Sequence, residues 1–354
     1  MPDKTMSEKK TKQIAPLFNP KQVSKRLLSV LSDRGRDVVL SRYGLGSKTK
    51  KMTLESIGEK YGITRERVRQ IENHSIANIR KSKEYEKEVK AFDELKHHLS
   101  VLGGVLSEHD LLNKFSSDKS TQNHIHFLLV VGEDFKKHKE DDEFKAHWHI
   151  DNKLAEKIHE TLRKIYSDLD DDDIVPESTI IESFLSYVKD VSEEYKNEEV
   201  IKRWLWMSKS LSKNPLGEWG KSDSSNINAR GVRDYAFLVI RKHGSPIHFR
   251  EVARLITEVF NKKAHVATTH NELIKDPRFV LVGRGLYALA EWGYISGVVK
   301  EVIIKILEKE GPLTKEEIIE KVLTERYVKP NTILVNLQNI KFFKKDKQNR
   351  YSLV

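Results

Sequence analysis

Residues 53–72 read TLESIGEKYGITRERVRQIE, and this stretch decides the fold of the N-terminal region. Thr53 is a typical cap for a helix that runs to Tyr61, and Thr64 is a typical cap for the helix that follows. Gly62 between them allows a tight turn. Apolar residues recur at spacings of three and four on both sides of the turn, so each helix buries one face. A helix, a glycine-containing turn and a second helix predict a helix-turn-helix.

Two more helices are predicted just upstream, between Val23 and Tyr43, from apolar residues with the same spacing. We expect Asp33 to cap the second of them and Gly44 to end it, with a basic loop at 48–51. Residues 20–82 are therefore predicted to form one helical region, which we call the head.

The exposed side of the last predicted helix of the head carries four residues that can read DNA bases: Arg65, Glu66, Arg69 and Gln70. They lie in its first two turns, the part of a recognition helix that meets base edges in the major groove. Arg pairs with guanine, Glu accepts from cytosine, and Gln pairs with adenine. These four positions are the predicted base-reading residues.

Together with Arg42-Tyr43-Gly44-Leu45, the quoted stretch resembles region 4 of housekeeping bacterial sigma factors, over about 60 residues. That region reads the upstream promoter element and contacts RNA polymerase, so the resemblance implies both activities here. It also places the base-reading contacts on Arg65, Glu66, Arg69 and Gln70. Contacts with the DNA backbone are implied near the residues Arg42, Thr53 and Leu54.

Only about 20 residues precede the head, whereas a full sigma factor carries an upstream segment that melts the promoter. We therefore expect a module that reads DNA without opening it. The alternative, that the head uses its surface for a protein partner, stays open.

Positive charge is concentrated in the head. The whole chain has 354 residues and a formal net charge of +10, and residues 21–82 hold fifteen Lys or Arg against six Asp or Glu. A basic region of this kind is typical of proteins that bind nucleic acid. We expect Arg67, Lys50 and Lys51 to neutralise phosphates beside the base-reading residues.

The rest of the chain contains a weak repeat of about 70 residues, with similar turns near 104, 173, 244 and 311. In each repeat a helix precedes the turn, two helices follow, and an apolar β-hairpin ends the unit, the pattern of a winged helix. The predicted class is mainly α, with tandem helix-turn-helix and winged-helix modules and small β-wings. The predicted segments are a disordered basic tail at 1–19, the head at 20–82, and winged-helix-like units at 83–150, 151–222 (acidic), 229–295 and 296–354, with a flexible linker at 221–228.

The unit at 229–295 contains the runs SPIHFREVA at 245–253 and FVLVGRGLYAL at 279–289, which resemble the HARE-type winged helix. That domain is also the folded part of the RNA polymerase delta subunit, so the resemblance implies contact with DNA or with a transcription complex. DNA contact is also considered for the wing of the last unit, which is rich in lysine.

Nothing in the sequence indicates an enzyme. The chain has no cysteine, which excludes disulfides, thiolate zinc sites and cysteine nucleophiles. His147 and His149 can share one face of a strand, but a metal site is the less favoured interpretation, and polar surface and wing residues the preferred one. We expect no cofactor, no metal and no small-molecule substrate.

The sequence therefore predicts a non-enzymatic transcription regulator that binds specific double-stranded DNA. Two alternatives remain: an accessory subunit of RNA polymerase that acts through protein contacts, and the targeting part of a DNA-modification or repair system. The N-terminus lacks an apolar signal segment, and no run of apolar residues is long enough to span a membrane. We expect a cytoplasmic, nucleoid-associated bacterial protein with no membrane partner.

Overall fold

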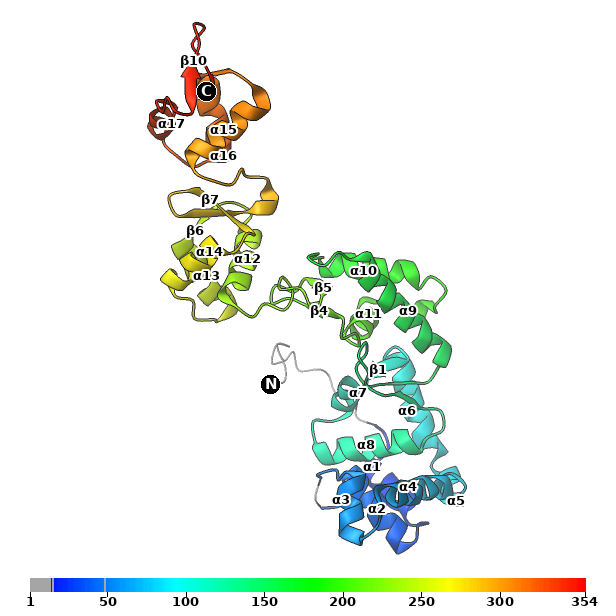
Figure 1. Cartoon of the computed structure of the whole chain (residues 1–354). Helices are drawn as coiled ribbons and strands as arrows, with labels where there is room; N and C mark the ends of the chain where they lie inside the picture. Colours follow the sequence, from blue (N-terminus) through cyan, green and yellow to red (C-terminus); the bar gives the residue numbers. More distant parts are fainter. Residues whose placement is uncertain (1–13, 15, 48) are drawn as a thin grey trace. The chain divides into compact units, whose positions relative to one another are not determined.

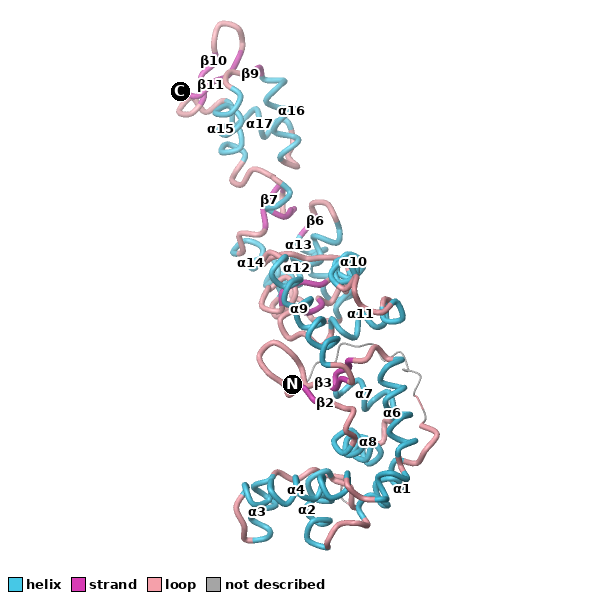
Figure 2. Tube along the Cα trace, turned by 90° about the vertical axis from the view of Figure 1, so that its right-hand side faces the viewer, coloured by secondary structure: helices cyan, strands magenta, loops and turns pink. Residues whose placement is uncertain are grey.

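The computed structural model describes residues 14, 16–47 and 49–354. These residues are mainly helical and carry only small antiparallel sheets (Figures 1 and 2), which confirms the predicted fold class. The chain divides into two compact units, one built from residues up to 171 with 175–212 and 219–222, the other from 172–174, 213–218 and 223–354.

The head consists of short helices joined by tight turns, and side-chain caps define where they begin. Their bounds are α1 Pro20–Leu28, α2 Asp33–Tyr43, α3 Leu54–Tyr61, α4 Arg65–Arg80 and α5 Lys83–Lys87. The hydroxyls of Thr53 and Thr64 accept from the backbone N–H groups of Ser56 and Arg67, as predicted for caps. The cap of α2 is Ser32 and not the predicted Asp33, because the Ser32 hydroxyl accepts from the Gly35 N–H.

The region after the head begins with α6 Val89–Val101. It continues with β1 Val105–Ser107, α7 Glu108–Phe115, α8 Lys119–Val131, β2 Lys136–His138 and β3 His147–His149. The three strands form an antiparallel sheet in the order β1-β3-β2, with Val105 and Lys136 both opposite His149.

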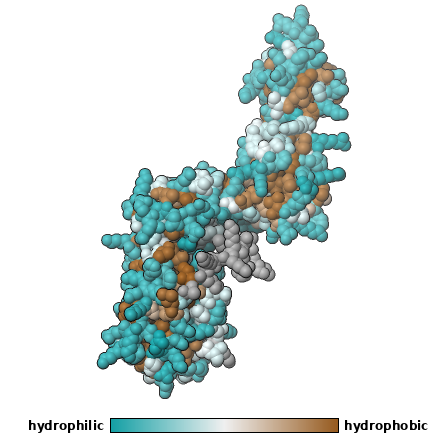
Figure 3. All heavy atoms as spheres, turned by 180° about the vertical axis from the view of Figure 1, so that it is seen from behind, coloured by the Kyte–Doolittle hydropathy of each residue, from teal (hydrophilic) through white to brown (hydrophobic). Residues whose placement is uncertain are grey.

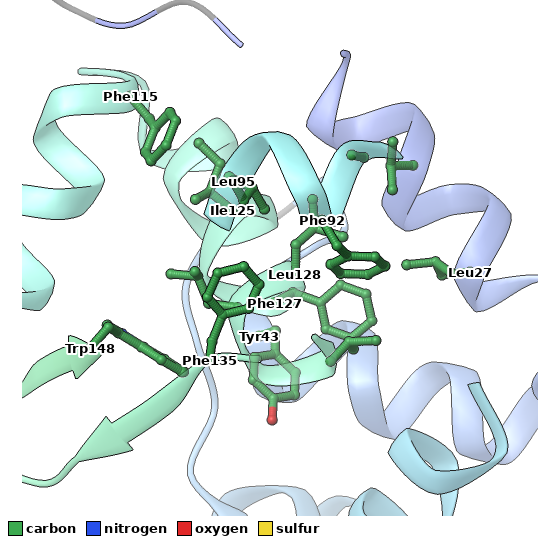
Figure 4. Close-up of a cluster of buried hydrophobic side chains, with 14 of the residues drawn as sticks. Leu27, Tyr43, Phe92, Leu95, Phe115, Ile125, Phe127, Leu128, Phe135 and Trp148 are labelled. Atoms are coloured by element: carbon green, nitrogen blue, oxygen red, sulfur yellow. The ribbon is translucent and has the colours of Figure 1, made fainter. Parts of the chain in front are cut away.

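The head and this following region share one hydrophobic core, which is shown in Figure 4. Leu27 of α1 and Tyr43 of α2 lie in the same buried cluster as Phe92 of α6 and Phe127 of α8. The Tyr43 and Phe127 rings meet edge to face, with centroids 5.5 Å apart. The head is thus not an isolated module, since α8 covers its apolar face.

The remainder of the first unit is built around a second core that includes the buried side chains of Phe184, Trp204 and Trp219. Its elements are α9 Asn152–Asp168, α10 Glu177–Tyr187, the 3-10 turn Glu193–Tyr195, α11 Glu198–Leu205, β4 Leu211–Lys213 and β5 Trp219–Lys221. Val105 of β1 and Phe144 also belong to this core, which ties it to the preceding region.

The second unit contains two successive groups of elements, each with its own core. The first has α12 Val232–His243, β6 Ile247–His248, α13 Phe249–Phe260, α14 Val266–Lys275, β7 Phe279–Gly283, β8 Leu286–Leu289 and the 3-10 turn Ala290–Trp292. The second has α15 Val299–Glu310, β9 Leu313–Thr314, α16 Lys315–Glu325, α17 Pro330–Leu337, β10 Phe343–Lys345 and β11 Arg350–Leu353.

Both groups repeat the order found at 89–149: a helix, a strand, two helices and a hairpin. The sheets have the orders β6-β8-β7 and β10-β11-β9. As in the sheet β1-β3-β2, the strand that comes last in sequence lies between the other two. On the face drawn in Figure 3, hydrophilic side chains surround smaller apolar areas.

The linker that the sequence predicts to be flexible is packed in the structure, and the described residues of the predicted tail also make contacts. Within the linker predicted at 221–228, Asn226 is buried, and its side-chain oxygen accepts from the Arg278 guanidinium at 2.9 Å. The predicted tail at 1–19 lies largely outside the described residues. Of its described part, the Ile14 N–H donates to the Lys114 carbonyl at 2.8 Å and Asn19 caps α1.

Among the described residues, none of the helices combines the length and the apolar character needed to cross a membrane.

Candidate nucleic-acid interface

The four predicted base-reading residues lie together on one exposed side of α4. Arg65, Glu66, Arg69 and Gln70 are all exposed, whereas Val68 between them is buried. At about 100° per residue the four positions fall within an arc of about 140°. The structure therefore gathers them on one surface at the N-terminal end of the second helix of the helix-turn-helix.

Glu66 and Arg69 form a two-pronged ion pair with each other on this surface. The Arg69 guanidinium donates to the Glu66 carboxylate through Nε at 2.8 Å and Nη2 at 2.6 Å, and both side chains are about half exposed. These hydrogen bonds from Arg69 lower the pKa of Glu66. The pair uses both oxygens of Glu66 and two of the three guanidinium nitrogens of Arg69, so it orients the two side chains toward each other.

Arg67 lies beside Gln70 at the edge of this surface. The Arg67 Nη1 donates to the Gln70 side-chain oxygen at 3.0 Å. The Gln70 side chain also hydrogen-bonds to the Glu66 carboxylate, so its amide is oriented between Arg67 and Glu66. Arg65 forms no ion pair with any described residue.

Arg42, which is predicted to contact the DNA backbone, also makes contacts within the head. The Arg42 Nη1 donates to the Met52 carbonyl at 3.1 Å, and its Nε lies 3.6 Å from the Glu72 carboxylate, which also accepts from the Tyr43 hydroxyl. Arg42 therefore ties the loop before α3 to the middle of α4.

Thr53 and Leu54 hold the start of α3 in place. The Thr53 hydroxyl accepts from the Ser56 N–H at 3.1 Å, and Leu54 packs on a small core of Val38, Ile57 and Val68. The hydroxyl of Thr53 keeps its own proton available for a phosphate oxygen.

Lys50 and Lys51 have different surroundings. Lys50 is exposed, whereas burial lowers the pKa of Lys51 to about 8, with attraction from Glu108 opposed by repulsion from Lys119. Near pH 8 only about half of the Lys51 side chains are positively charged. Lys50 is therefore better placed than Lys51 to bind a phosphate.

The turn between α3 and α4 is closely packed. Gly62 adopts a left-handed conformation with φ of 62°, and a Cβ built on Gly58 lies 2.6 Å from the Ile63 carbonyl oxygen. Gly58 therefore limits how closely α3 and the turn approach, whereas Gly62 supplies the left-handed backbone that the turn needs.

Sequence reasoning missed the support that α8 gives to the head. Asn123, which is buried, donates from its side-chain nitrogen to the carbonyls of Gly44 at 3.0 Å and Thr49 at 2.8 Å. Arg80 at the end of α4 donates to the carbonyls of Val130 and Val131, both at 2.9 Å. The signal was present, because residues 124–131 read HIHFLLVV and a helix that is apolar on all sides is a buried helix.

His147 and His149 lie on a strand of the β2–β3 hairpin, and both are buried, so the prediction that they are polar surface residues is wrong. His147 Nε2 lies 2.9 Å from Nε2 of His159 on α9, and the His138 ring stacks on His147 with centroids 4.6 Å apart. Among the described residues, no three His, Asp or Glu side chains are arranged to hold a metal ion.

Comparison with known proteins identifies the head. Residues 27–81 match the family described as sigma-70, region 4. RNA polymerase sigma factor SigA1 of Synechococcus elongatus is 50% identical over 54 residues, which cover 15% of this chain and 13% of that protein. RNA polymerase sigma factor RpoS of Coxiella burnetii is 46% identical over 55 residues, or 16% of this chain and 15% of that protein.

RNA polymerase principal sigma factor HrdD of Streptomyces griseus is 36% identical over 55 residues, which cover 16% of this chain and 16% of that protein. The chain thus spans only 13% to 16% of the length of these three relatives. Residues 27–81 are similar to region 4 of the sigma-70 factors, a DNA-binding helix-turn-helix of RNA polymerase sigma factors.

Proposed function

We propose that this protein is a non-enzymatic transcription regulator that binds specific double-stranded DNA through its sigma-like head. In this role α4 enters the major groove and Arg65, Glu66, Arg69 and Gln70 meet the base edges. Lys50 and the hydroxyl of Thr53 contact phosphates on the flanking strand. The protein acts in the bacterial cytoplasm on the nucleoid.

One observation carries this proposal: the four base-reading side chains share one exposed side at the capped start of α4, in the segment that is similar to sigma-70 region 4. Their chemistry covers guanine, cytosine and adenine, so the surface is suited to a sequence and not to charge alone.

The proposal is tested with Arg69→Ala in the full-length protein. Loss of one two-pronged contact with a base costs ~1–3 kcal/mol of discrimination, so we expect a roughly tenfold or greater loss of affinity for the selected site. We also expect relaxed preference at one base position. Selection from random duplexes, followed by fluorescence anisotropy on the enriched site, measures both quantities.

Lys90→Ala is the matched control, because Lys90 is an exposed cation on α6, outside the helix-turn-helix. It removes one positive charge and is expected to leave base preference unchanged. If the Arg69 variant keeps both the affinity and the preference of the wild type, α4 does not read DNA in the proposed way.

A second candidate function is an accessory subunit of RNA polymerase whose head docks on the enzyme. It is favoured by the names of the relatives, which are all RNA polymerase sigma factors. Recovery of polymerase with the tagged protein from a nuclease-treated extract supports this function, especially if Arg69→Ala leaves the recovery unchanged.

The regions outside the head act, in this proposal, as winged helices that extend the DNA footprint or recruit partners. The order helix, strand, two helices and hairpin, which is found at 89–149, 232–289 and 299–353, supports this interpretation for those three regions, as does the HARE-like sequence at 229–295. The same array would suit the targeting part of a DNA-modification or repair system, for which nuclease or methyltransferase activity of the pure protein is the test.

A further inference from the structure

The last group of elements, residues 295–354, which we call the C-terminal module, separates its charges into two regions. Residues 301–325, which form most of α15 and all of β9 and α16, hold seven glutamates against four lysines. Residues 329–354, which form α17 and the β10–β11 hairpin, hold six cations against the single carboxylate of Asp346. The six are Lys329, Lys341, Lys344, Lys345, Lys347 and Arg350. Along the chain, the first stretch of this module is thus moderately acidic and the second strongly basic.

The hairpin cations are exposed, and most lack an acidic partner. Asp346 pairs with Arg350 at 3.0 Å across the hairpin. Among the described carboxylates, none lies within ion-pair distance of Lys341, Lys344 or Lys347. On α16, by contrast, Lys321 pairs with Glu310 at 2.7 Å. Unneutralised cations grouped on one hairpin favour binding of a polyanion.

Helix α17 lies next to this hairpin and exposes uncharged side chains. It buries Ile333 and Leu337, while Asn331, Thr332 and Val335 are exposed. The exposed fraction of Val335 is 65%, which is large for an apolar side chain. Amides, hydroxyls and methyl groups are the groups that contact base edges and thymine methyls in the major groove.

The chain that enters α17 is held firmly. The Tyr327 N–H donates to the Val282 carbonyl of β7 at 2.7 Å, and buried Arg326 donates to the Gly297 carbonyl at 2.8 Å. The hydrogen bond from Tyr327 also occupies part of the β7 edge. The β10–β11 hairpin exposes Lys344 and Lys345, whereas Val280 and Val282 of the β7–β8 hairpin are buried.

We propose that the C-terminal module has a second surface for duplex DNA, separate from the head. Helix α17 lies in a groove, and the lysines of the β10–β11 hairpin contact phosphates of the flanking backbone. Duplex DNA is favoured over a protein partner because a helix with hydrogen-bonding and methyl groups stands beside cations that no acidic side chain neutralises. The proposal does not depend on base reading by α4.

The test compares two triple variants of the full-length protein. The first is Lys341→Ala with Lys344→Ala and Lys347→Ala, on the hairpin. The matched control is Lys305→Ala with Lys309→Ala and Lys315→Ala, which removes the same charge from exposed positions on α15 and α16. Binding to a duplex of roughly 30 base pairs of random sequence is measured from about 50 to 300 mM salt.

Each phosphate contact contributes ~0.9 to the slope of log affinity against log salt, so the hairpin variant is expected to lower the slope by about 2–3. The control is expected to lower it by less than about 1. Thermal melting of both variants checks that they are folded. Equal slopes for the two variants overturn the proposal. It is also overturned if the wild type binds single-stranded RNA more tightly than duplex DNA and the hairpin variant loses that RNA binding.

A failure here is distinguishable from a failure of the head. The hairpin variant is expected to keep the base preference found by selection while losing salt-dependent affinity. Arg69→Ala is expected to change the preference while keeping the salt slope nearly constant. A second variant, Val335→Lys on α17, is expected to raise affinity for random duplex if this helix faces DNA, and an unchanged affinity contradicts that placement.

Discussion

At the scale of single residues, Gly58 limits how the helix-turn-helix can be built. A Cβ at this position meets the Ile63 carbonyl oxygen at 2.6 Å, a backbone atom that can move only if the turn moves. Gly58→Ala is therefore expected to lower the free energy of unfolding by about 1–2 kcal/mol, because overpacking outweighs the better helix propensity of alanine. Urea denaturation measures this change, and DNA affinity is expected to fall with it.

Gly46→Ala is the control for this prediction, because a Cβ on Gly46 has no atom within 4 Å. We expect it to change stability by less than about 0.5 kcal/mol, as is usual at open surface positions. A Gly58 variant as stable as the wild type would mean that the turn adapts at no cost.

At the scale of elements, the contact between the β2–β3 hairpin and α9 contains buried neutral histidines. Burial lowers the pKa of His147 and of His159 to about 4, and repulsion between these two rings and from His138 adds to this effect for His159. Asp141, which lies 3.5 Å from His138, and Arg163, which pairs with Glu143, are the charged groups nearby. Protonation of this cluster opposes the folded state.

The expected consequence is a loss of stability in mild acid. Below the ordinary histidine pKa of 6.5 the unfolded chain takes up protons, whereas the folded chain does so only near 4. The contribution of the cluster to stability is therefore complete above about pH 6.5 and falls as the pH drops toward 4, by an amount on the order of 2 kcal/mol at pH 5.

His159→Gln is expected to flatten this pH dependence while keeping an N–H that can donate to His147. His109→Gln is the control, since the His109 side chain is 84% exposed. Urea denaturation at pH 7.5 and pH 5 gives the comparison. Identical pH dependence in the wild type and the His159 variant would show that the cluster is not the cause.

At the scale of the whole molecule, the two compact units decide which fragments fold. The head buries Leu27, Tyr43 and Ile79 in the same core as Phe92 and Phe127. A fragment of residues 1–90 lacks α8 and exposes this apolar surface, so we expect it to be largely unfolded or aggregated.

A fragment of residues 1–222 contains both cores of the first unit and is expected to unfold in a cooperative transition. Circular dichroism and the dispersion of amide resonances distinguish the two cases. A well-dispersed spectrum from residues 1–90 would show that the head is stable without α8.

The sequence by itself determined the helix-turn-helix, its two threonine caps, its turn and the mainly helical class. These features depend on local chemistry: hydroxyls that cap helix ends, a glycine with positive φ and apolar spacings of three and four. The sharing of one side of α4 by Arg65, Glu66, Arg69 and Gln70 also follows from helix geometry alone.

Only the tertiary structure decided which charged side chains of the head are engaged by other parts of the chain. Arg42 lies 3.6 Å from the Glu72 carboxylate and binds the loop before α3, and Lys51 lies half-buried near Glu108. The tertiary structure also packs α8 against the apolar face of the head and buries the histidines of β3. Such contacts join residues far apart in sequence, and periodicity reports which face of a helix is buried but not which segment covers it.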